Sequence, residues 1–365
     1  MDPVTHAASG AIAMLAIKNR PATLWAWPLA AIACASPDID LVFIHTPLEF
    51  LELHRGITHS FAFMPVMSLI LALLFYPLWR KSTKKRWSFV GVWFFCCLML
   101  LLHTWLDVVT TYGTMVLLPF SHYRVRWNSL FIVDLCLTLP LLWALWRWRA
   151  KRGLIVLALL WTFVYPAAGV GFNYWHTNQW REKLASENTP VAESRVLPDL
   201  FMPLFWRIIY EDKSGEFPAV KDASLDFFGR PRAIESSFVG LDRKLIELFK
   251  ETSLEGEVFF DFAVLPVARD LPEKFMPEDA SPDKKYYLIH DLRFGSGLKF
   301  VQKILEARPN ADMPFLFMAE LSGELENPRV DRIRLRFSDS GRDSGWHIPQ
   351  RPEKPTIWQW LVGLR

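Results

Sequence analysis

The sequence is poor in cysteine and in charged residues. Its 365 residues include four cysteines, and charged residues make up 22% of the chain. No two cysteines have the CxxC spacing, and the second half has none, so we expect neither a thiolate zinc site nor a disulfide framework. Because all four lie in apolar runs, we expect buried and inert thiols. They are Cys34, Cys96, Cys97 and Cys136.

Several functional signatures are also missing. The net charge of +3 is too small to indicate nucleic-acid binding, and the second half has no basic patch interleaved with aromatic residues. The sequence has no Walker loop, no GxGxxG in a suitable context, and no convincing Ser-His-Asp or Cys-His arrangement. The first residues, MDPVTH, lack the basic start of a cleaved signal peptide. We therefore expect Met1 to be retained.

Long apolar runs dominate the first half of the chain. Hydrophobic residues make up 52% of the sequence, with 17 Trp and 28 Phe. Four of the runs approach the ~20 residues that cross a bilayer, whereas the first two are shorter and fit either two short helices or a re-entrant hairpin. The pattern predicts a multi-pass α-helical membrane domain over residues 1–172. The runs cover 7–17, 22–36, 61–79, 88–109, 129–146 and 154–172.

The second half, residues 173–365, has the regular charges and prolines of a globular domain. We expect an amphipathic helix from Asn173 to about Pro198, followed by an α+β soluble domain. The predicted strands are Trp206–Tyr210, Val258–Phe262, Tyr286–Phe294, Pro314–Leu321 and Val330–Phe337, and the predicted helices are Leu241–Lys250 and Gly297–Leu305.

Three clusters of lysine and arginine alternate with the apolar runs, at 18–20, 80–86 and 147–152. By the positive-inside rule these three loops are cytoplasmic. Both termini and the domain from about 173 then lie on the outer side of the membrane. The same orientation places most of the ionisable residues of the first half on that outer face.

The stretch His54-Arg55-Gly56-Ile57-Thr58-His59-Ser60 has the composition of a metal site. Neutral imidazole is a common ligand for zinc, and a glycine permits the tight turn that would aim His54 and His59 at one point. Arg55 can hold a phosphate or a carboxylate with two hydrogen bonds. The alternative is a loop at the membrane surface whose histidines lie among the lipid headgroups.

Two carboxylate motifs accompany these histidines. Asp38 and Asp40 end the second apolar run and suit metal coordination, although acids that cap a helix would give the same pattern. His103 and Asp107 lie four residues apart, which puts them on one helix face. Ionisable groups inside an apolar segment are costly and mark function by default, the alternative being a structural pair that ties helices together.

Other polar residues near the outer face are ambiguous. His6 would be structural if taken alone, but its placement beside the other sites favours a ligand. Asp134 fits either a carboxylate that orients a ligating histidine or a polar contact between helices. The basic and aromatic loop 119–126 can receive an anionic headgroup through Arg124 and Arg126, or it is simply interfacial.

Together these residues exceed what one tetrahedral ion needs. Two divalent ions, with zinc as the expected metal, would use them as in many phosphoesterases, where a bound water is the nucleophile. We predict catalytic roles for Arg55 and Asp40 and substrate binding by Arg124 and Arg126. The predicted metal ligands are His6, Asp38, Asp40, His54, His59, His103 and Asp107.

In their apolar frame, His6, SPDID, HRGITHS and HTWLD resemble the bacterial inner-membrane metal-dependent hydrolase family (YdjM-like), over residues 1–172. Phe201–Tyr210 and Asp291–Gly295 look like the extended members that carry a C-terminal domain. The resemblance implies that the seven residues above form a metal site in the inner membrane, and that the reaction is a hydrolysis. It implies no substrate, although the family is similar in character to zinc-dependent phospholipases.

The sequence therefore favours a membrane hydrolase that acts on an ester or phosphoester of a lipid or lipid-linked molecule at the outer face. A rival interpretation is a metal-stabilised scaffold or sensor whose outer domain binds a protein partner. An open coordination position favours the enzyme, and a fully enclosed metal favours the scaffold. A metal-ion transporter would spread its ligands across the membrane, which the one-sided distribution argues against.

Overall fold

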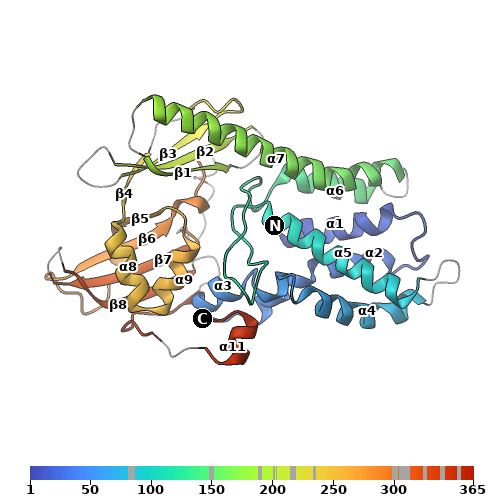
Figure 1. The fold of residues 1–365 in the computed structure, drawn as a ribbon, viewed down its shortest axis with the longest axis horizontal. Coiled ribbons are helices and arrows are strands. Elements are labelled where there is room, and N and C mark those ends of the chain that lie inside the picture. The colour runs from blue at the N-terminus through green and yellow to red at the C-terminus, as the bar shows by residue number, and fades with distance from the viewer. Residues whose placement is uncertain are drawn as a thin grey trace.

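The computed structural model divides into a helical half and a sheet half that lie side by side along the long axis (Figure 1). The residues that it describes are 1–80, 87–147, 152–187, 191–199, 202, 204–213, 219–232, 236–297, 303, 313–323, 327–337, 342–351 and 355–365.

The helical half follows the predicted apolar runs. Its first helix begins where Asp2 accepts a hydrogen bond from the Thr5 amide and Pro3 takes the first turn, where a missing N–H costs nothing. The helices are α1 Pro3–Ala16, α2 Ala26–Ala35, η1 Ser36–Val42, α3 Pro47–Leu53, η2 Ile57–His59, α4 Met64–Arg80, α5 Phe89–Val108, α6 Leu135–Trp146 and α7 Arg152–Ser186.

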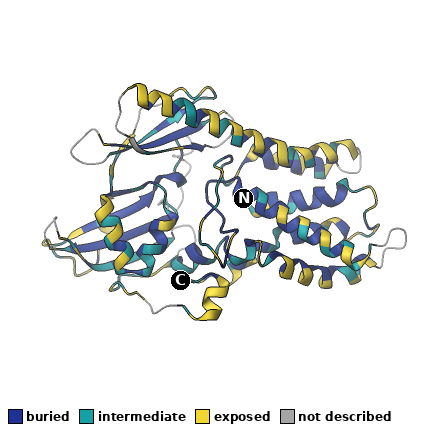
Figure 2. Cartoon of the chain, viewed as in Figure 1, coloured by how far each residue is buried: buried dark blue, intermediate teal, exposed yellow. Residues whose placement is uncertain are grey.

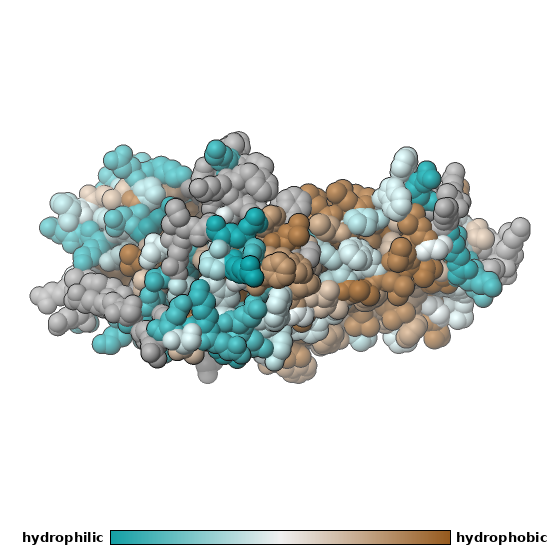
Figure 3. Space-filling view, turned by 90° about the horizontal axis from the view of Figure 1, so that it is seen from above, coloured by the Kyte–Doolittle hydropathy of each residue, from teal (hydrophilic) through white to brown (hydrophobic). Residues whose placement is uncertain are grey.

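By length and composition, α5 and α7 are able to cross a membrane. The pair formed by Pro47–His59 and α4 is bent by 71° and counts as a third span if it crosses as one unit. The described residues thus give two or three candidate spans, whereas the sequence suggested four runs of spanning length. One reason is that α6 is only 12 residues long. Hydrophobic side chains cover the surface of this half, and hydrophilic ones cover much of the sheet half (Figure 3).

Described residues in or next to the three basic clusters lie at one end of the helical half. Trp87, before α5, donates from Nε1 to the Asn19 carbonyl at 2.9 Å. Arg152, at the start of α7, donates to the Ala16 carbonyl at 3.2 Å. These contacts gather the end of α1 and the starts of α5 and α7 at the end farthest from the sheet (Figure 1). The polar residues of the predicted site lie at the opposite end.

The helix α7 corrects one prediction. It continues without a break past residue 173 and ends at Ser186, so the sixth apolar run and the amphipathic stretch are one helix. The segment Val191–Pro198 was predicted as the end of that helix but is strand β1. Its backbone pairs with β2, which gives this segment hydrogen bonds that a longer, exposed helix would not gain from packing.

The sheet half contains a nine-stranded antiparallel sheet whose strands lie in chain order. The predicted strands at Trp206, Tyr286, Pro314 and Val330 and the predicted helix at Leu241 are confirmed, with small shifts of their ends. The strands are β1 Val191–Pro198, β2 Trp206–Asp212, β3 Ala219–Leu225, β4 Ser236–Gly240, β5 Pro266–Asp270, β6 Lys285–Asp291, β7 Phe315–Ser322, β8 Arg329–Phe337 and β9 Arg342–Asp343.

One strand prediction is wrong. Val258–Phe262 belongs to helix α9, Leu254–Phe262, because Ser253 caps the segment by accepting from the Gly256 amide. Two acidic residues in its first turn complement the helix dipole and support the same outcome. The predicted helix Gly297–Leu305 lies almost entirely outside the described residues. The remaining helical elements are α8 Arg243–Thr252, η3 Glu273–Phe275, η4 Leu292–Phe294 and α11 Ile357–Val362.

The core of the sheet half reaches into the helical half. Phe249 of α8 and Phe259 of α9 pack on Phe317 of β7, with ring centroids 5.3 Å apart in each pair. Phe50 of α3 joins the same cluster through Phe337, at 4.4 Å. Helix α3 therefore connects the two halves, and it leads directly into the histidine-rich turn. Buried residues line the facing sides of these elements (Figure 2).

Candidate metal centre

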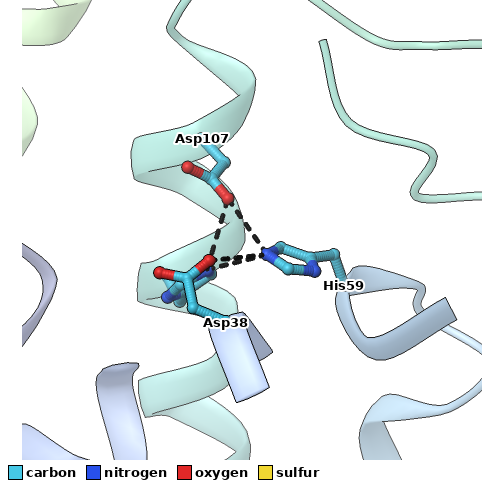
Figure 4. A group of neighbouring side chains, drawn as sticks. Asp38, His59 and Asp107 are labelled. Atoms are coloured by element: carbon cyan, nitrogen blue, oxygen red, sulfur yellow. Dashed lines mark hydrogen bonds and ion pairs between the residues drawn. The ribbon is translucent and has the colours of Figure 1, made fainter. Parts of the chain in front are cut away.

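The polar residues of the predicted site meet where two short 3-10 helices converge with α1 and α5. Asp38 and Asp40 lie on η1, and His59 ends η2. His103 and Asp107 lie one turn apart on α5, and His6 comes from α1. The side chains of Asp38, His59 and Asp107 point toward one another (Figure 4).

Four ligand atoms form one compact group. The Nε2 atoms of His59 and His103 lie 3.0 Å apart, and each is 3.2 Å from Asp107 Oδ2. Asp38 Oδ1 lies 3.5 Å from His59 Nε2 and 3.7 Å from His103 Nε2. A tetrahedral zinc ion with bonds of about 2.0–2.1 Å separates its ligand atoms by about 3.3 Å. The observed separations therefore fit a single ion.

The hydrogen bonds on the far side of each imidazole favour this arrangement. His103 Nδ1 donates to the Cys34 carbonyl at 2.7 Å. His59 Nδ1 lies 2.9 Å from the Thr58 hydroxyl, which itself donates to Asp40 Oδ2 at 3.3 Å. The Nδ1 atoms of both rings are thus engaged outside the centre, which leaves the two Nε2 atoms directed at each other and at Asp107. Histidines oriented from behind in this way are typical of metal centres.

Asp107 is held so that one oxygen remains for a metal. Its Oδ1 accepts from the Arg55 guanidinium at 3.0 Å and from the Met1 amino group. Its Oδ2 is buried and has no hydrogen-bond donor among the described residues. An ionised carboxylate oxygen closed off from water in this way is costly unless a cation faces it.

A second group of ligand atoms is formed by Asp38, Asp40 and His54. His54 Nδ1 lies 3.2 Å from Asp40 Oδ1, and Asp40 Oδ2 accepts from the Arg55 amide at 3.1 Å. Asp38 belongs to both groups, so its carboxylate is common to the two candidate metal sites.

His6 reaches the centre but lies beside the converging atoms. Its ring stacks on that of His103, with centroids 3.7 Å apart, and its Nε2 is 3.3 Å from Asp107 Oδ1. It does not belong to either group of ligand atoms that the described residues form. Ligation by His6 therefore stays a prediction.

The turn through the histidine-rich stretch needs glycine for a different reason from the one that the sequence suggested. The residue with a left-handed backbone is Arg55, with φ of 57°, and not Gly56. At Gly56 an added Cβ would lie 2.7 Å from the Leu53 carbonyl oxygen, so the turn needs glycine because space is lacking. A left-handed conformation at a large residue is a strained feature that clusters at functional sites. It lets Arg55 reach both Asp107 and Thr110.

Arg124 and Arg126, in the loop 119–126, lie between the centre and the sheet half. Arg124 packs over the ring of Tyr112, which in turn contacts the ring of His54 at 5.5 Å. It donates to the backbone carbonyls of Gly113 and Leu51. Burial lowers the pKa of Arg126 to about 9, and nearby Arg293 adds to that shift. Its buried Nη1 has no hydrogen-bond partner among the described residues.

Asp134 is a structural residue of the helices. It caps α6 by accepting from the Leu137 amide at 3.0 Å, and it accepts from the Tyr165 hydroxyl of α7 at 3.0 Å. Of the two interpretations that the sequence left open, these bonds support the contact between helices.

Sequence reasoning missed three parts of the centre. The Met1 amino group contacts Asp107, the Cys34 carbonyl orients His103, and Thr58 orients His59. Thr58 carried a signal, because it lies between the two histidines of the turn. The other two contacts involve backbone groups, which no residue type identifies.

These features define the class: a helical membrane protein with a buried His and Asp centre at the junction with an antiparallel sheet domain. Residues 1–179, just under half of the chain, match the family described as "YdjM inner membrane protein". The resemblance noted from HRGITHS and HTWLD is thereby confirmed. The family is one of inner membrane proteins, and the candidate spans of this chain agree with that description.

A curated relative is the "Uncharacterized protein YfhP" of Bacillus subtilis (strain 168). It is 30% identical over 142 residues, which are 37% of this chain and 41% of the relative. The chain thus spans less than half of that relative's length. No solved structure matches the chain significantly.

Proposed function

We propose that the protein is a metal-dependent hydrolase that acts on an ester or phosphoester of a lipid or lipid-linked molecule. The observation that carries this proposal is that the centre reaches the surface on one side. The side chains of Asp38 and His54 are each 13% exposed, whereas those of His59, His103 and Asp107 are fully buried. Protein encloses the side of the centre formed by His59, His103 and Asp107, and a substrate would reach the centre from the side of η1.

In this proposal the residues of the chain have separate tasks. Asp38, His59, His103 and Asp107 hold a divalent ion, which supplies a Lewis acid that polarises the ester and activates water. Arg55 fixes Asp107, and Asp40 fixes Thr58 and thereby the orientation of His59.

The proposed substrate class follows from what surrounds the accessible side. The exposed residues next to Asp38 and Asp40 are apolar: Ile39 is 50% exposed, Val42 69% and Phe43 65%. Apolar side chains around a polar centre suit a substrate that stays in the bilayer while its headgroup reaches the metal. The unpartnered Arg126 Nη1 is available to an anionic headgroup at the same end of the helices.

We further propose that the centre and the sheet half face the outer side of the inner membrane. The support is that residues in or next to the three basic clusters, Asn19, Trp87 and Arg152, lie at the opposite end, together with the preference of basic loops for the cytoplasm.

The test is hydrolysis by purified full-length protein in mixed micelles, after chelation and reloading with zinc or manganese. A panel of phospholipids and lipid-linked phosphates serves as substrate. We expect metal-dependent turnover that His103→Ala abolishes and Asp134→Asn retains, since the Asp134 side chain bonds, among the described residues, to α6 and α7. Failure of the metal-loaded protein on every lipid ester would overturn the proposal.

The rival function, a metal-stabilised scaffold or sensor, has one observation in its favour. Three of the four ligands are fully buried, and the centre adjoins α3, which packs into the core of the sheet half. An ion there would stabilise the junction of the halves. Chelation that lowers the Tm of the protein, with no turnover before or after, would favour this rival.

A further inference from the structure

Helix α11 is an exposed apolar segment near the end of the chain. All of its six residues, 357–362, are exposed, although five of them are large and apolar or aromatic. Ile357 is 77% exposed and Trp358 is 79% exposed. An apolar helix that packs so little of its own surface is costly in water. Contact of these side chains with lipid or with another protein would therefore be more favourable than contact with water.

The segment is attached to the helical half, and the Arg365 side chain also pairs with Asp261 of α9. The ring of Trp360 contacts that of Phe120, with centroids 6.4 Å apart. His122 Nε2 donates to the Gly363 carbonyl at 3.1 Å, and Gly363 lies so close to Leu118 that an added Cβ would be 2.7 Å from it. Farther along, the Arg365 amide donates to Glu52 of α3 at 3.1 Å. Helix α11 thus keeps a fixed position relative to the membrane helices.

The loop that holds α11 also exposes apolar side chains. Leu117 is 48% exposed and Phe120 is 80% exposed. We call Leu117, Phe120, Ile357, Trp358 and Leu361 the C-terminal patch.

The C-terminal patch is continuous with the surface of the membrane helices. The Val116 carbonyl accepts from the Phe61 amide at 3.0 Å, which brings the loop to the start of α4. Phe61 is itself 51% exposed, and an exposed apolar stripe continues from it along α4. The stripe consists of Val66, Leu69, Ile70, Leu73 and Leu74. The patch thus extends the lipid-facing side of α4 beyond the end of the helix.

We propose that α11 and the loop 117–120 lie in the interfacial layer of the bilayer, where they hold the sheet half against the membrane surface. Trp and Phe prefer this layer, because their rings are apolar and, in Trp, one edge donates a hydrogen bond. A short amphipathic or apolar helix in the plane of the interface is a known way to attach a domain. The position beside the outer end of α4 favours lipid over a protein partner as the occupant.

The test measures the depth of a nitroxide label in full-length protein reconstituted into phosphatidylcholine–phosphatidylglycerol nanodiscs. The label is placed at Trp358→Cys, at Ile357→Cys as a second position, and at Val239→Cys as the control. Val239 is 63% exposed on β4 of the sheet half. The signal of labelled unmutated protein is subtracted, because Cys97 and Cys136 are only partly buried.

Collision with oxygen, which enters lipid, is compared with collision with a water-soluble nickel complex. We expect oxygen to dominate at 357 and 358 and nickel to dominate at 239. Nickel-dominated collisions at all three positions would overturn the proposal, because α11 would then lie in water. Protection of 357 and 358 from both reagents would also overturn it, because a protein partner or a second copy would then cover the patch.

Discussion

At the scale of single residues, the hydrogen bonds that hold the ligating side chains from outside the centre determine what the centre can bind. The Nδ1 atoms of His59 and His103 each form a hydrogen bond outside the centre, and Arg55 occupies one oxygen of Asp107. The remaining atoms, the two Nε2 atoms and Asp107 Oδ2, face one another at 3.0–3.2 Å. A cation at their middle would stabilise this arrangement. The residue types were evident in the sequence, but the ring orientations and the shared position of Asp38 depend on η1 and η2 and were not.

A titrating residue of the sheet half gives a separate residue-scale prediction. Burial lowers the pKa of His290 on β6 to about 4, and Arg269 lowers it further. Its Nδ1 has no hydrogen-bond partner among the described residues. The unfolded chain therefore binds a proton more readily than the folded chain, and stability falls as the pH drops from about 6.5 toward 4. We expect a loss of about 2 kcal/mol between pH 7 and pH 5 from this histidine.

The measurement compares the thermal unfolding of His290→Gln and of the unmutated protein in detergent at pH 7 and pH 5. The Tm of the variant should fall less between the two pH values, whatever its stability at pH 7. An equal fall in both proteins would show that His290 is not buried in its neutral form.

At the scale of elements, the sequence predicted the regular segments better than their ends. Runs rich in aromatic, aliphatic and β-branched residues predicted β6, β7 and β8. Buried and partly exposed residues alternate along part of β8, whereas both faces of β7 are buried. The same criterion failed at Val258–Phe262, where a run of valine and phenylalanine is equally apolar as a helix and the cap at Ser253 decides. It failed again at residue 173, where the apolar run ends but helix α7 continues to Ser186 and packs beside β1.

The packing of α1 on α2 offers an element-scale prediction. A Cβ added at Gly10 would lie 2.4 Å from the Ala30 carbonyl oxygen and 2.5 Å from the Cys34 Cβ. Gly10→Ala should therefore push the two helices apart and destabilise the protein by about 1–3 kcal/mol. Since Cys34 also orients His103 through its carbonyl, metal affinity should fall as well.

The matched control is Gly171→Ala on α7, where an added Cβ meets nothing within 4 Å. This control should keep or raise the Tm, because alanine favours a helix more than glycine does. A Gly10→Ala protein as stable as the control would contradict the close approach of α1 and α2.

At the scale of the whole molecule, the apolar helices, the polar centre and the sheet half follow one another along one axis (Figures 1 and 3). The alternation of lysine and arginine clusters predicted that the polar residues share one end of the helices, because the positive-inside rule depends on composition alone. The association of α3 with the core of the sheet half was not predictable. It depends on contacts such as that of Phe50 with Phe337, which join residues far apart in the sequence.

The proposed orientation is tested by reporter fusions at Lys84 and after Arg365. We expect cytoplasmic activity at Lys84 and periplasmic activity after Arg365, since one lies in a basic loop and the other beside α3. Periplasmic activity at Lys84 would contradict the orientation and would move the centre to the inner face.

The central claim is that Asp107 takes part in a metal centre, and metal content tests it most directly. Asp107→Asn keeps the shape of the side chain but removes the charge that Arg55, His59 and His103 now face. Loss of a group that orients a ligand costs ~10–100-fold in metal affinity, and loss of a ligand costs more. Asp134→Asn is the matched control, because Asp134 is an equally buried aspartate whose side chain bonds, among the described residues, to Tyr165 and the start of α6.

The measurement is the amount of divalent metal bound per chain in the purified unmutated protein and in the two variants at equal expression. The account predicts bound metal in the unmutated protein and in Asp134→Asn, and its loss in Asp107→Asn. An Asp107→Asn protein that retains the metal content of the unmutated protein would contradict the centre described above.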